Sequence, residues 1–440
     1  MKFTLEQEYI INRAINWFYN EPDNQLFQYA GSPGTGKSVV LNEIVKRLGL
    51  DIETEVMPMA YIGSAALNMR KYGLSSARTA HSWLYELIEV PKIDSNGDFV
   101  YKDTGKIVLE KRFVPKKNIS MYIKLMIVDE AYCMPMSMRE TIMKHNIKVL
   151  ACGDTNQLPP VADKPAFLID GEILRLTQIL RQGDRDDIIF LANRRMQNQS
   201  ISKGYYGHSL VIDREELTDE MFLWADAVIC GTNRTRDIIN NHIRYIKGYN
   251  TILPMYGEKL VCRNNNWLIN ARTPDGYNMA LVNGLIGAVI NQPSIDTYDN
   301  RTKTFNIIFK SDIIDCTFNA SANFDYLVSD NEMRQKIKNI NAGKVHGQLF
   351  EFAYCITCHI AQGSQFNKVI FIEEYMGDLQ PAINLVGATR AVKSLIYVRN
   401  NFKKWQEYPE DPDLKRQIGL YREKLQLRDK KYYYRTNLYH

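Results

Sequence analysis

The chain has 440 residues, of which 45% are hydrophobic and 24% are charged, a composition typical of a globular protein of two or three domains. Its 55 basic and 50 acidic residues give a net charge of +5, which permits a polyanionic partner without requiring one. No apolar stretch reaches the ~18 residues that cross a bilayer, no apolar signal region follows the first residues, and seven scattered cysteines favour reduced thiols. We therefore expect a cytoplasmic protein that does not enter a membrane.

The first part of the chain alternates between helical and strand-like patterns. Helical periodicity covers residues 4–19 and 38–48, whereas short apolar runs at 25–30, 125–128 and 148–152 predict strands of a buried parallel sheet. Residues 91–118 interrupt this alternation with two turn signals, Asn96-Gly97 and Thr104-Gly105. We expect an inserted β-hairpin there.

The second part repeats the α/β pattern around a β-rich insertion. A strand at 227–230 precedes a helix at 235–246, residues 257–346 contain short strands with a turn at Asn283-Gly284, and α/β character returns at 350–398. Residues 401–440 are basic and rich in Tyr. The spacing of their apolar residues predicts a final helix that packs on the body of the protein. The predicted domains are 1–90 with 119–175, the hairpin 91–118, 176–256 with 347–400, the insertion 257–346, and the tail 401–440.

A phosphate-binding loop is the strongest motif. It matches the Walker A pattern without a gap and lies between a predicted strand and a predicted helix: Gly31, Ser32, Pro33, Gly34, Thr35, Gly36, Lys37 and Ser38. The glycines allow backbone N–H groups to approach phosphate oxygens, and the helix N-terminus adds a partial positive charge. Lys37 is expected to reach the β- and γ-phosphates, and the Ser38 hydroxyl to bind Mg²⁺. The sequence therefore predicts a site for a nucleoside triphosphate.

Two adjacent carboxylates follow the predicted strand 125–128. Asp129 and Glu130 lie at the carboxyl end of this strand, which places them beside the phosphate loop in a parallel sheet. We expect Asp129 to hold Mg²⁺ through water and Glu130 to polarise the attacking water. An isolated Asp-Glu pair is usually a solvated turn, but its combination with a phosphate loop favours the catalytic interpretation.

Residues 150–160, LACGDTNQLPP, resemble the GDxxQLPP motif of superfamily 1 helicases, in which Gln157 would sense the γ-phosphate. Further segments resemble that family's motifs in the family's order. They are Thr4-Leu5-Glu6-Gln7 (adenine reading), Thr79-Ala80-His81 (strand contact), Leu176 to Gln182 with a first arginine finger at Arg181, Thr357 to Gly363 with Gln362, and Val386 to Ala391 with a second finger at Arg390. The chain most resembles the RecD/Dda branch of superfamily 1B, whose compact layout favours a phage source.

This resemblance implies a fold, an activity and a set of partners. The fold would be α/β, with two RecA-like P-loop domains, a β-hairpin inserted in the first and an SH3-like β-barrel inserted in the second. The activity would be ATP- and Mg²⁺-dependent 5′→3′ movement of a monomer on single-stranded DNA, with unwinding at forks. Gln7, Gln362 and Gly363 would belong to the nucleotide site, and proteins of replication or recombination, such as a single-strand binding protein or a recombinase, are possible partners.

Contacts to DNA are expected from small polar groups suited to phosphate or sugar. The resemblance assigns them to Thr79, His81, Thr232, Asn233, Thr357 and His359. One segment departs from the family pattern, because residues 60–66, AYIGSAA, lack the expected Thr. Ser64 or the backbone amides of that turn would take the phosphate contact instead.

Two aromatic residues near the predicted hairpin tip suggest how strands could be separated. Phe99 or Tyr101 could stack against the fork as a wedge, or both rings could only hold the hairpin to the body. Two other features have plainer interpretations. Trp83 and Tyr85 favour core packing, and Cys355-Ile356-Thr357-Cys358 lacks a second cysteine pair at zinc spacing.

Two other functions remain open on the sequence alone. One is an ATP-driven translocase that acts on RNA or does not separate strands, since discrimination by the 2′-hydroxyl cannot be read from sequence. The other is a nucleotide-gated nucleic-acid binding module without hydrolysis. The intact set of Lys37, Asp129, Glu130, Gln157 and Arg390 argues against the second.

Overall fold

A computed structural model describes residues 3–91, 93, 98–101, 105, 107–160, 163–178, 186–274, 278–293, 303–312, 315–339 and 346–400. The chain divides into two compact units. The first comprises residues 1–199, 362–364 and 378–389, and the second comprises 200–361, 365–377 and 390–440. Among the described residues, no helix has both the length and the apolar character needed to cross a membrane.

The first unit is built on a six-stranded parallel sheet with the order β3-β2-β6-β7-β1-β8. Its strands are β1 (Leu26–Gly31), β2 (Val56–Ala60), β3 (Arg78–Thr79), β6 (Leu125–Asp129), β7 (Lys148–Gly153) and β8 (Ile173–Leu176). The three strands expected from apolar runs are confirmed to within one residue at each end. Because all six strands run the same way, the loops after β1, β6 and β7 meet at one edge of the sheet.

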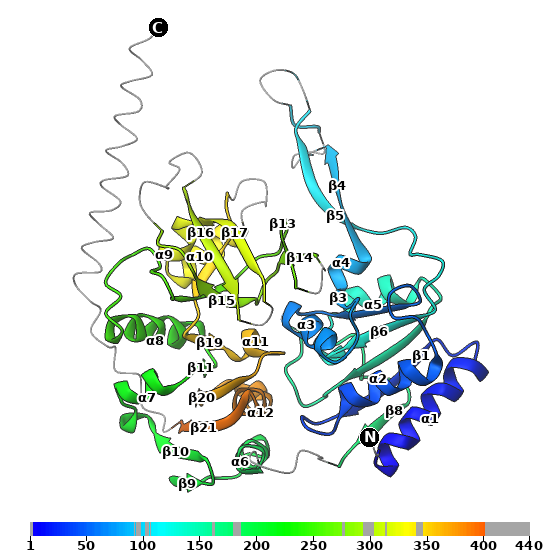
Figure 1. Cartoon of the computed structure of the whole chain (residues 1–440), viewed down its shortest axis with the longest axis horizontal. Helices are drawn as coiled ribbons and strands as arrows, with labels where there is room; N and C mark the ends of the chain where they lie inside the picture. The colour runs from blue at the N-terminus through cyan, green and yellow to red at the C-terminus, as the bar shows by residue number, and fades with distance from the viewer. Residues whose placement is uncertain are drawn as a thin grey trace. The chain divides into compact units, whose positions relative to one another are not determined.

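Helices cover both faces of this sheet (Figure 1). They are α1 (Leu5–Asn20), α2 (Lys37–Leu48), α3 (Gly63–Lys71), α4 (Ala80–Leu84), η1 (Ala131–Cys133) and α5 (Met136–Met143). The first unit also includes α6 (Asp186–Met196) and α12 (Gln380–Thr389), which contact each other. On one face, Trp17 of α1 and Val40 of α2 are buried against the strands, and on the other Leu84 of α4 and Ile142 of α5 are buried. Both faces are therefore apolar, as expected for a parallel sheet.

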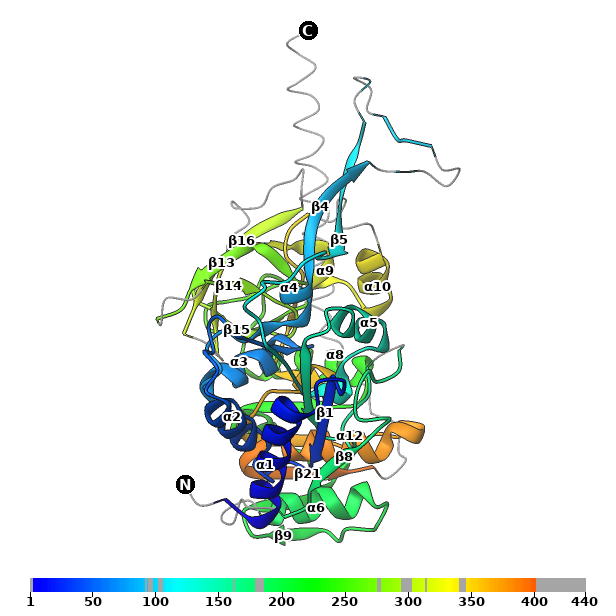
Figure 2. The ribbon, with the colours of Figure 1, turned by 90° about the vertical axis from the view of Figure 1, so that its right-hand side faces the viewer.

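A two-stranded arm projects from the first unit. β4 (Tyr85–Pro91) pairs antiparallel with β5 (Leu109–Pro115), and beyond the strands two isolated bridges join Ile93 to Phe99 and Tyr101 to Ile107. Figures 1 and 2 show the arm extending away from the sheet of this unit. The hairpin strands begin at Tyr85, six residues before the start expected from the turn signals.

The second unit contains a six-stranded sheet with the order β19-β11-β20-β21-β10-β9, in which only the β9–β10 pair is antiparallel. Its strands are β9 (Gly204–Tyr206), β10 (Ser209–Asp213), β11 (Ala227–Cys230), β19 (Cys355–Thr357), β20 (Phe366–Ile372) and β21 (Ala391–Arg399). Its helices include η2 (Arg214–Glu216), α7 (Asp219–Trp224), α8 (Asn233–Ile246) and α11 (Cys358–Ala361). The short helix η4 (Gly377–Leu379) contains the point in the sequence where the chain passes from the second unit to the first. The parallel core of this second sheet agrees with the predicted second α/β domain.

The β-rich insertion forms an antiparallel sheet of its own, with the order β17-β16-β15-β12-β18. Its elements are β12 (Lys259–Cys262), β13 (Asn266–Arg272), β14 (Asn278–Leu281), β15 (Ile286–Val289), β16 (Thr304–Ser311), β17 (Thr317–Asn323), α9 (Phe324–Val328), α10 (Asn331–Asn339) and β18 (Phe350–Phe352). A turn occurs at Asn283-Gly284, where Gly284 has a φ of 85°, as the sequence predicted. The predicted tail helix at 401–440 lies outside the described residues.

Candidate nucleotide site and nucleic-acid contacts

The phosphate loop follows β1 and leads directly into α2. Gly34 and Gly36 have φ values of 91° and 87°, a left-handed conformation that side chains with a Cβ rarely adopt. The Lys37 ammonium donates to the carbonyl of Gly31 at 2.7 Å, and the Thr35 hydroxyl donates to the carbonyl of Ser32 at 2.9 Å. These bonds hold the Lys37 cation over the loop, where a triphosphate would lie.

The N-terminus of α2 has the features of a phosphate site. Gly36 caps the helix without a side-chain hydrogen bond, and no acidic residue lies in the first turn. The first backbone N–H groups, which include that of Ser38, are therefore available to phosphate oxygens. Space is tight behind the loop, because a Cβ on Gly31 would lie 2.5 Å from Thr35 Oγ1.

Gln7 is tied to the phosphate loop by its side chain. Its amide nitrogen donates to the carbonyl of Thr35 at 3.1 Å, and its amide oxygen accepts from the Thr4 N–H at 3.1 Å. Thr4 and Gln7 together form the capping box of α1. The start of α1 is thereby fixed against the loop, and the adenine-reading role of Gln7 stays a prediction.

Asp129 ends β6 beside the loop, in a half-buried position. Burial, followed by the neighbouring Glu130 charge, raises the pKa of Asp129 to about 6. One carboxylate oxygen accepts from the Glu130 N–H at 2.9 Å and from the Cys152 thiol at 3.3 Å. Glu130 has a left-handed φ of 48°, an uncommon conformation of the kind that clusters at functional sites.

These residues fit a magnesium–nucleotide complex. Mg²⁺ in nucleotide sites takes one or two protein oxygens together with phosphate oxygens, and Ser38 and Asp129 can supply such oxygens. Among the residues that the structure describes, no cluster of three or more His, Cys, Asp or Glu side chains could hold a metal ion alone. A magnesium ion here would therefore depend on the nucleotide for further ligands.

Gln157 lies in the loop after β7, at the same sheet edge. The residue is only 4% exposed, and its buried amide oxygen has no hydrogen-bond partner among the described residues. The Gln362 amide donates to the carbonyl of the adjacent Leu158 at 3.3 Å within the first unit. The motif at 150–160 thus lies against Gln362, and a phosphate-sensing role would use the unpartnered amide oxygen of Gln157.

Ser64 and Gly363 lie against each other in the first unit. The Ser64 hydroxyl donates to the carbonyl of Gln362 at 3.0 Å, and Ser64 is almost completely buried. Gly363 has a φ of 74°, and a Cβ on it would lie 2.9 Å from Ser64 Oγ. The Ser64 hydroxyl is therefore occupied by a backbone carbonyl, and its predicted contact with a DNA phosphate would require this bond to open.

The predicted strand contacts of the first unit lie at the start of α4. The Thr79 hydroxyl caps α4 by accepting from the Ser82 N–H at 3.3 Å, and its own proton remains available to a ligand. The His81 ring lies between Tyr61 and Tyr85, with centroid distances of 5.9 and 5.4 Å, and burial lowers its pKa. Tyr85 and Trp83 are partly buried against the core, which agrees with the packing role expected for them.

In the second unit, Thr232 caps α8 but does so together with a buried carboxylate. Glu374 accepts from the Gly231 N–H at 2.7 Å, the Thr232 N–H at 2.9 Å, the Thr232 hydroxyl at 3.1 Å and the Thr235 hydroxyl at 2.5 Å. The one hydroxyl proton of Thr232 is thus directed to Glu374 rather than to a ligand. Asn233, the first residue of α8, accepts from Arg236 at 2.9 Å.

The other predicted residues are placed as follows. Thr357 ends β19, and His359 follows in α11 with a pKa lowered by burial. Arg390 is 6% exposed and begins the connection from α12 to β21. Arg181 lies outside the described residues. Cys355 lies 3.6 Å from Cys230, sulfur to sulfur, so the C-x-x-C segment is packed into the sheet.

Sequence reasoning missed two side chains that organise these sites. Cys152 acts through Asp129, and its only sequence signal is its position next to Gly153-Asp154. Glu374 was detectable by analogy, because Glu373-Glu374 follow an apolar strand in the same way that Asp129-Glu130 follow the apolar run 125–128. The sequence does not show that the carboxylate of Glu374 lies beside the residues that follow β11.

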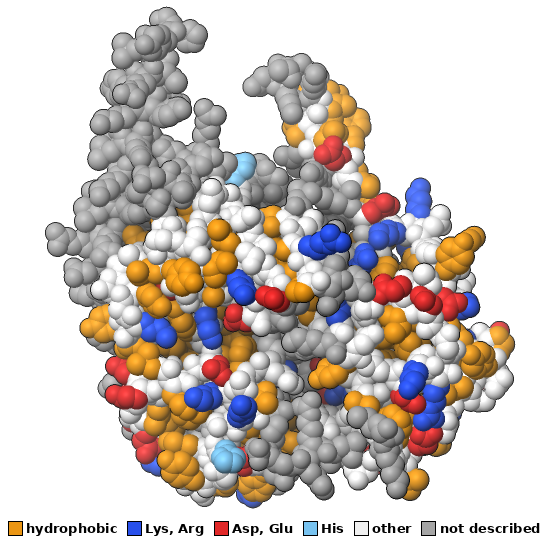
Figure 3. Space-filling model, viewed as in Figure 1, with side chains coloured by type: hydrophobic (Ala, Val, Ile, Leu, Met, Phe, Trp, Pro, Cys, Tyr) orange, Lys and Arg blue, Asp and Glu red, His pale blue; other side chains and the backbone are white. Residues whose placement is uncertain are grey.

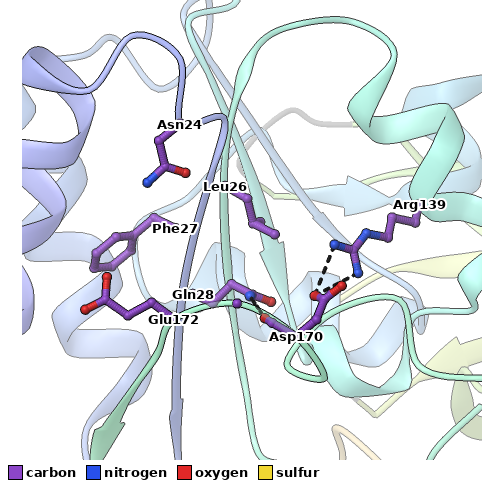
Figure 4. A pocket seen from close by; sticks show the side chains of 8 residues that line it. Asn24, Leu26, Phe27, Gln28, Arg139, Asp170 and Glu172 are labelled. Atoms are coloured by element: carbon purple, nitrogen blue, oxygen red, sulfur yellow. Dashed lines mark hydrogen bonds and ion pairs between the residues drawn. The ribbon is translucent and has the colours of Figure 1, made fainter.

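A separate cavity of about 290 Å³ lies at the amino end of β1 (Figure 4). Its wall includes an ion pair between Arg139 and Asp170 at 3.1 Å, and Gln28 donates to the backbone carbonyl of Asp170 at 2.7 Å. The phosphate loop lies at the opposite, carboxyl end of β1. This cavity is therefore not part of the nucleotide site.

A parallel sheet with a Walker A loop after its first strand defines the class of P-loop nucleotide-binding proteins. Consistent with this, residues 13–213 match the family model described as an AAA domain. The fold is similar to that of Pif1 helicase from Bacteroides in complex with ADP-AlF3 and single-stranded DNA, with 18% identity, a TM-score of 0.50, and coverage of 96% of this chain and 98% of that chain.

Two further solved structures have a similar extent of match. Pif1 helicase from Candida albicans has 17% identity and a TM-score of 0.49, covering 96% of this chain and 99% of that chain. Bacteroides Pif1 bound to single-stranded DNA has 18% identity and a TM-score of 0.49, covering 90% and 92%. The similarity to the Bacteroides complex with ADP-AlF3 agrees with an α/β fold built on parallel sheets of the RecA-like P-loop type.

Proposed function

We propose that this protein is an ATP-dependent motor of the superfamily 1B helicase type that moves on single-stranded DNA and unwinds duplexes at forks. The observation that supports this proposal most directly is that Lys37, Asp129, Glu130 and Gln157 lie at one edge of one parallel sheet. The fold likeness extends over 96% of the chain to a Pif1 helicase whose structure contains ADP-AlF3 and single-stranded DNA. This likeness supports the same class of ligands for this chain.

ATP hydrolysis would use the residues of the first unit in distinct roles. Lys37 and the amides at the start of α2 would hold the β- and γ-phosphates, Ser38 and Asp129 would hold Mg²⁺, and Glu130 would orient the attacking water. Gln157 would sense whether a γ-phosphate is present. Arg181 and Arg390 would supply positive charge to the transferred phosphoryl group, an effect worth roughly 10³–10⁵ in rate for arginine fingers.

DNA contacts would involve both units. Thr79 has a free hydroxyl proton and His81 lies in an aromatic group, so they suit a phosphate and a base or sugar, respectively. Asn233, Thr357 and His359 are the corresponding candidates of the second unit. Ser64 and Thr232 would participate only after their present bonds to Gln362 and Glu374 rearrange.

Several finer assignments belong to this proposal. They are the RecD/Dda branch, 5′→3′ polarity, an SH3-like class for the small antiparallel sheet, a wedge on the hairpin arm, action as a monomer in the cytoplasm, and a phage source. Proteins of replication or recombination are the partners that this assignment favours. Each assignment rests on the resemblance of the sequence motifs to those of superfamily 1B helicases, and not on a contact in the structure.

The deciding experiment is ATP hydrolysis with and without single-stranded DNA, with matched RNA and duplex DNA as controls. We expect strong stimulation by single-stranded DNA and its loss in Lys37→Ala, because that substitution removes the cation that holds the phosphates. Arg47→Ala, which removes an exposed ion pair with Glu8, is a matched control that should retain activity. Nucleotide binding without stimulation would instead favour a nucleotide-gated binding module, and stimulation by RNA alone would favour an RNA translocase.

A further inference from the structure

A cluster of charged side chains in the second unit joins α8 to the small antiparallel sheet. Arg236 is 1% exposed and forms ion pairs with Glu351 at 2.7 Å and Asp237 at 2.8 Å. Arg263 reaches Glu351 at 3.2 Å, and Arg334 reaches Asp237 at 3.0 Å. We call the group the Arg236 cluster; it consists of Arg236, Asp237, Arg263, Tyr326, Arg334, Lys338 and Glu351.

The Arg236 cluster has more positive than negative charge. It contains four cations but only two carboxylates, Asp237 and Glu351. The nearby Arg244–Glu258 pair provides a contrast, because it is equally buried and has one cation for one anion, joined at 2.7 and 3.1 Å. Excess charge shielded from water is costly unless it is paired, so an anion that enters the Arg236 cluster would relieve that cost.

Lys338 is the member whose charge is least compensated. Its ammonium lies 5.7 Å from the centre of the Tyr326 ring, and the described residues offer it no carboxylate within ion-pair distance. The Tyr326 hydroxyl is itself directed to Glu351 at 2.6 Å. The unpaired positive charge of the cluster is thus concentrated at its half-buried Lys338 side.

The pKa values of two members of the cluster follow from this excess of positive charge. Burial, followed by repulsion from Arg263, lowers the pKa of Lys338 to about 8. Burial alone would raise the pKa of Glu351, but the surrounding arginines, Arg263 first, lower it to about 2. Glu351 is therefore fully ionised at neutral pH, and the two carboxylates of the cluster still do not balance its four cations.

We propose that Lys338 and Arg263 of the Arg236 cluster bind a phosphate of the single-stranded nucleic-acid backbone. This inference rests on the proposed function. A phosphodiester carries one negative charge and two exposed oxygens, which suits an arginine and a lysine at the rim of a desolvated site. Arg236 also donates to Asn233 at the start of α8, so the cluster is linked to a residue already predicted to contact the strand.

The test compares the binding of single-stranded DNA at several salt concentrations. Lys338→Met should weaken binding about fivefold at low salt and make the dependence of log affinity on log salt shallower by roughly 0.7, the change expected for one lost phosphate contact. Lys338→Arg should restore both values. An oligonucleotide with abasic sites should show the same difference, because the contact is to the backbone.

Lys336→Met is the matched control on the same helix. Lys336 is exposed and paired with Glu332 at 2.7 Å, so its loss should leave the affinity and the salt dependence nearly unchanged. Equal effects of Lys336→Met and Lys338→Met, or no effect of Lys338→Met, would overturn the inference. Absence of DNA binding by the wild-type protein would instead refute the proposed function, so the two failures are distinguishable.

Discussion

At the scale of single residues, the candidate nucleotide site depends on atoms that approach one another closely. Gly31 ends β1 with its Cα against Thr35 and Leu176, and a Cβ there would lie 2.5 Å from Thr35 Oγ1 and 3.0 Å from Leu176 Cβ. Its carbonyl oxygen also accepts a hydrogen bond from the Lys37 ammonium. Gly31 therefore sets both the shape of the loop and the position of its cation.

Gly31→Ala should weaken nucleotide binding by about tenfold or more, because the loop must move to admit the methyl group. Titration of a fluorescent ATP analogue would measure this loss. Gly49→Ala is the control, since Gly49 has a left-handed φ of 67° but nothing within 4 Å of its Cβ position. That control should lose some stability and keep its nucleotide affinity; unchanged binding in Gly31→Ala would contradict the close-packing argument.

Glu374 is the second residue on which a local structure depends. Its carboxylate satisfies two backbone N–H groups and two hydroxyls at the start of α8. Glu374→Gln removes the negative charge that two buried backbone N–H groups face, and it replaces one acceptor oxygen by a donor, so that the Thr232 and Thr235 hydroxyls would have to reverse. We expect a loss of about 2–3 kcal/mol in the free energy of unfolding.

Thermal unfolding would measure this loss as a lower Tm for Glu374→Gln. Glu220→Gln changes an exposed carboxylate in the first turn of α7 and should leave the Tm nearly constant. An unchanged Tm in Glu374→Gln would show that the carboxylate does not stabilise the start of α8.

At the scale of elements, the hairpin arm presents apolar side chains to solvent. Five of them are at least 38% exposed: Ile93, Phe99, Tyr101, Ile107 and Leu109. Figure 3 shows hydrophobic side chains on the described part of the arm. Neither Phe99 nor Tyr101 is buried against the body of the first unit. This exposure favours the wedge interpretation over the interpretation in which the rings only hold the arm in place.

Replacement of both Phe99 and Tyr101 by Ala should reduce the rate of fork unwinding by about tenfold or more while ATP hydrolysis stimulated by single-stranded DNA stays within about twofold. The reason is that strand separation would need the rings, whereas translocation would not. Met121→Ala, at an 87% exposed position outside the arm, controls for loss of apolar surface. Parallel losses of unwinding and hydrolysis would reject the wedge.

Element positions were predictable where a single stretch of sequence determines them. β1, β6 and β7 are continuous apolar runs between polar loops, and they were located to within one residue. The hairpin start was missed because Tyr85 follows α4 without a Gly or Pro to mark the change. α8 begins at Asn233 rather than Thr235, since Thr232 caps it together with Glu374, which lies 142 positions away in the sequence.

The site was predictable to the same degree and for the same reason. Contiguous motifs fixed Lys37, Asp129 and Gln157 at one sheet edge, because parallel strands bring their carboxyl ends together. The occupied hydroxyls of Ser64 and Thr232, and the thiol of Cys152 on Asp129, depend on which strands become neighbours. No local pattern contains that information.

At the scale of the whole molecule, the Arg236 cluster links α8, α10 and β18 of the second unit by charge. Lys338 has a pKa of about 8 there, below the ordinary 10.5. Between these two pH values, the unfolded chain binds a proton that the folded chain has already lost. The contribution of Lys338 to the free energy of unfolding therefore rises with pH across this window, and below pH 8 its unfavourable charge is fully present.

The difference in Tm between Lys338→Met and the wild-type protein isolates this contribution from other titrating groups. The variant should be more stable by a few degrees at pH 7, because it lacks the uncompensated ammonium, and its advantage should shrink as pH rises from about 8 toward 10.5. Lys336→Met should show no such trend, since Lys336 is paired with Glu332. Single-stranded DNA should also abolish the higher Tm of Lys338→Met at pH 7, because a bound phosphate would stabilise the charged form of Lys338 in the wild-type protein. A difference in Tm that is independent of both pH and DNA would mean that the methionine side chain simply packs better than the lysine it replaces.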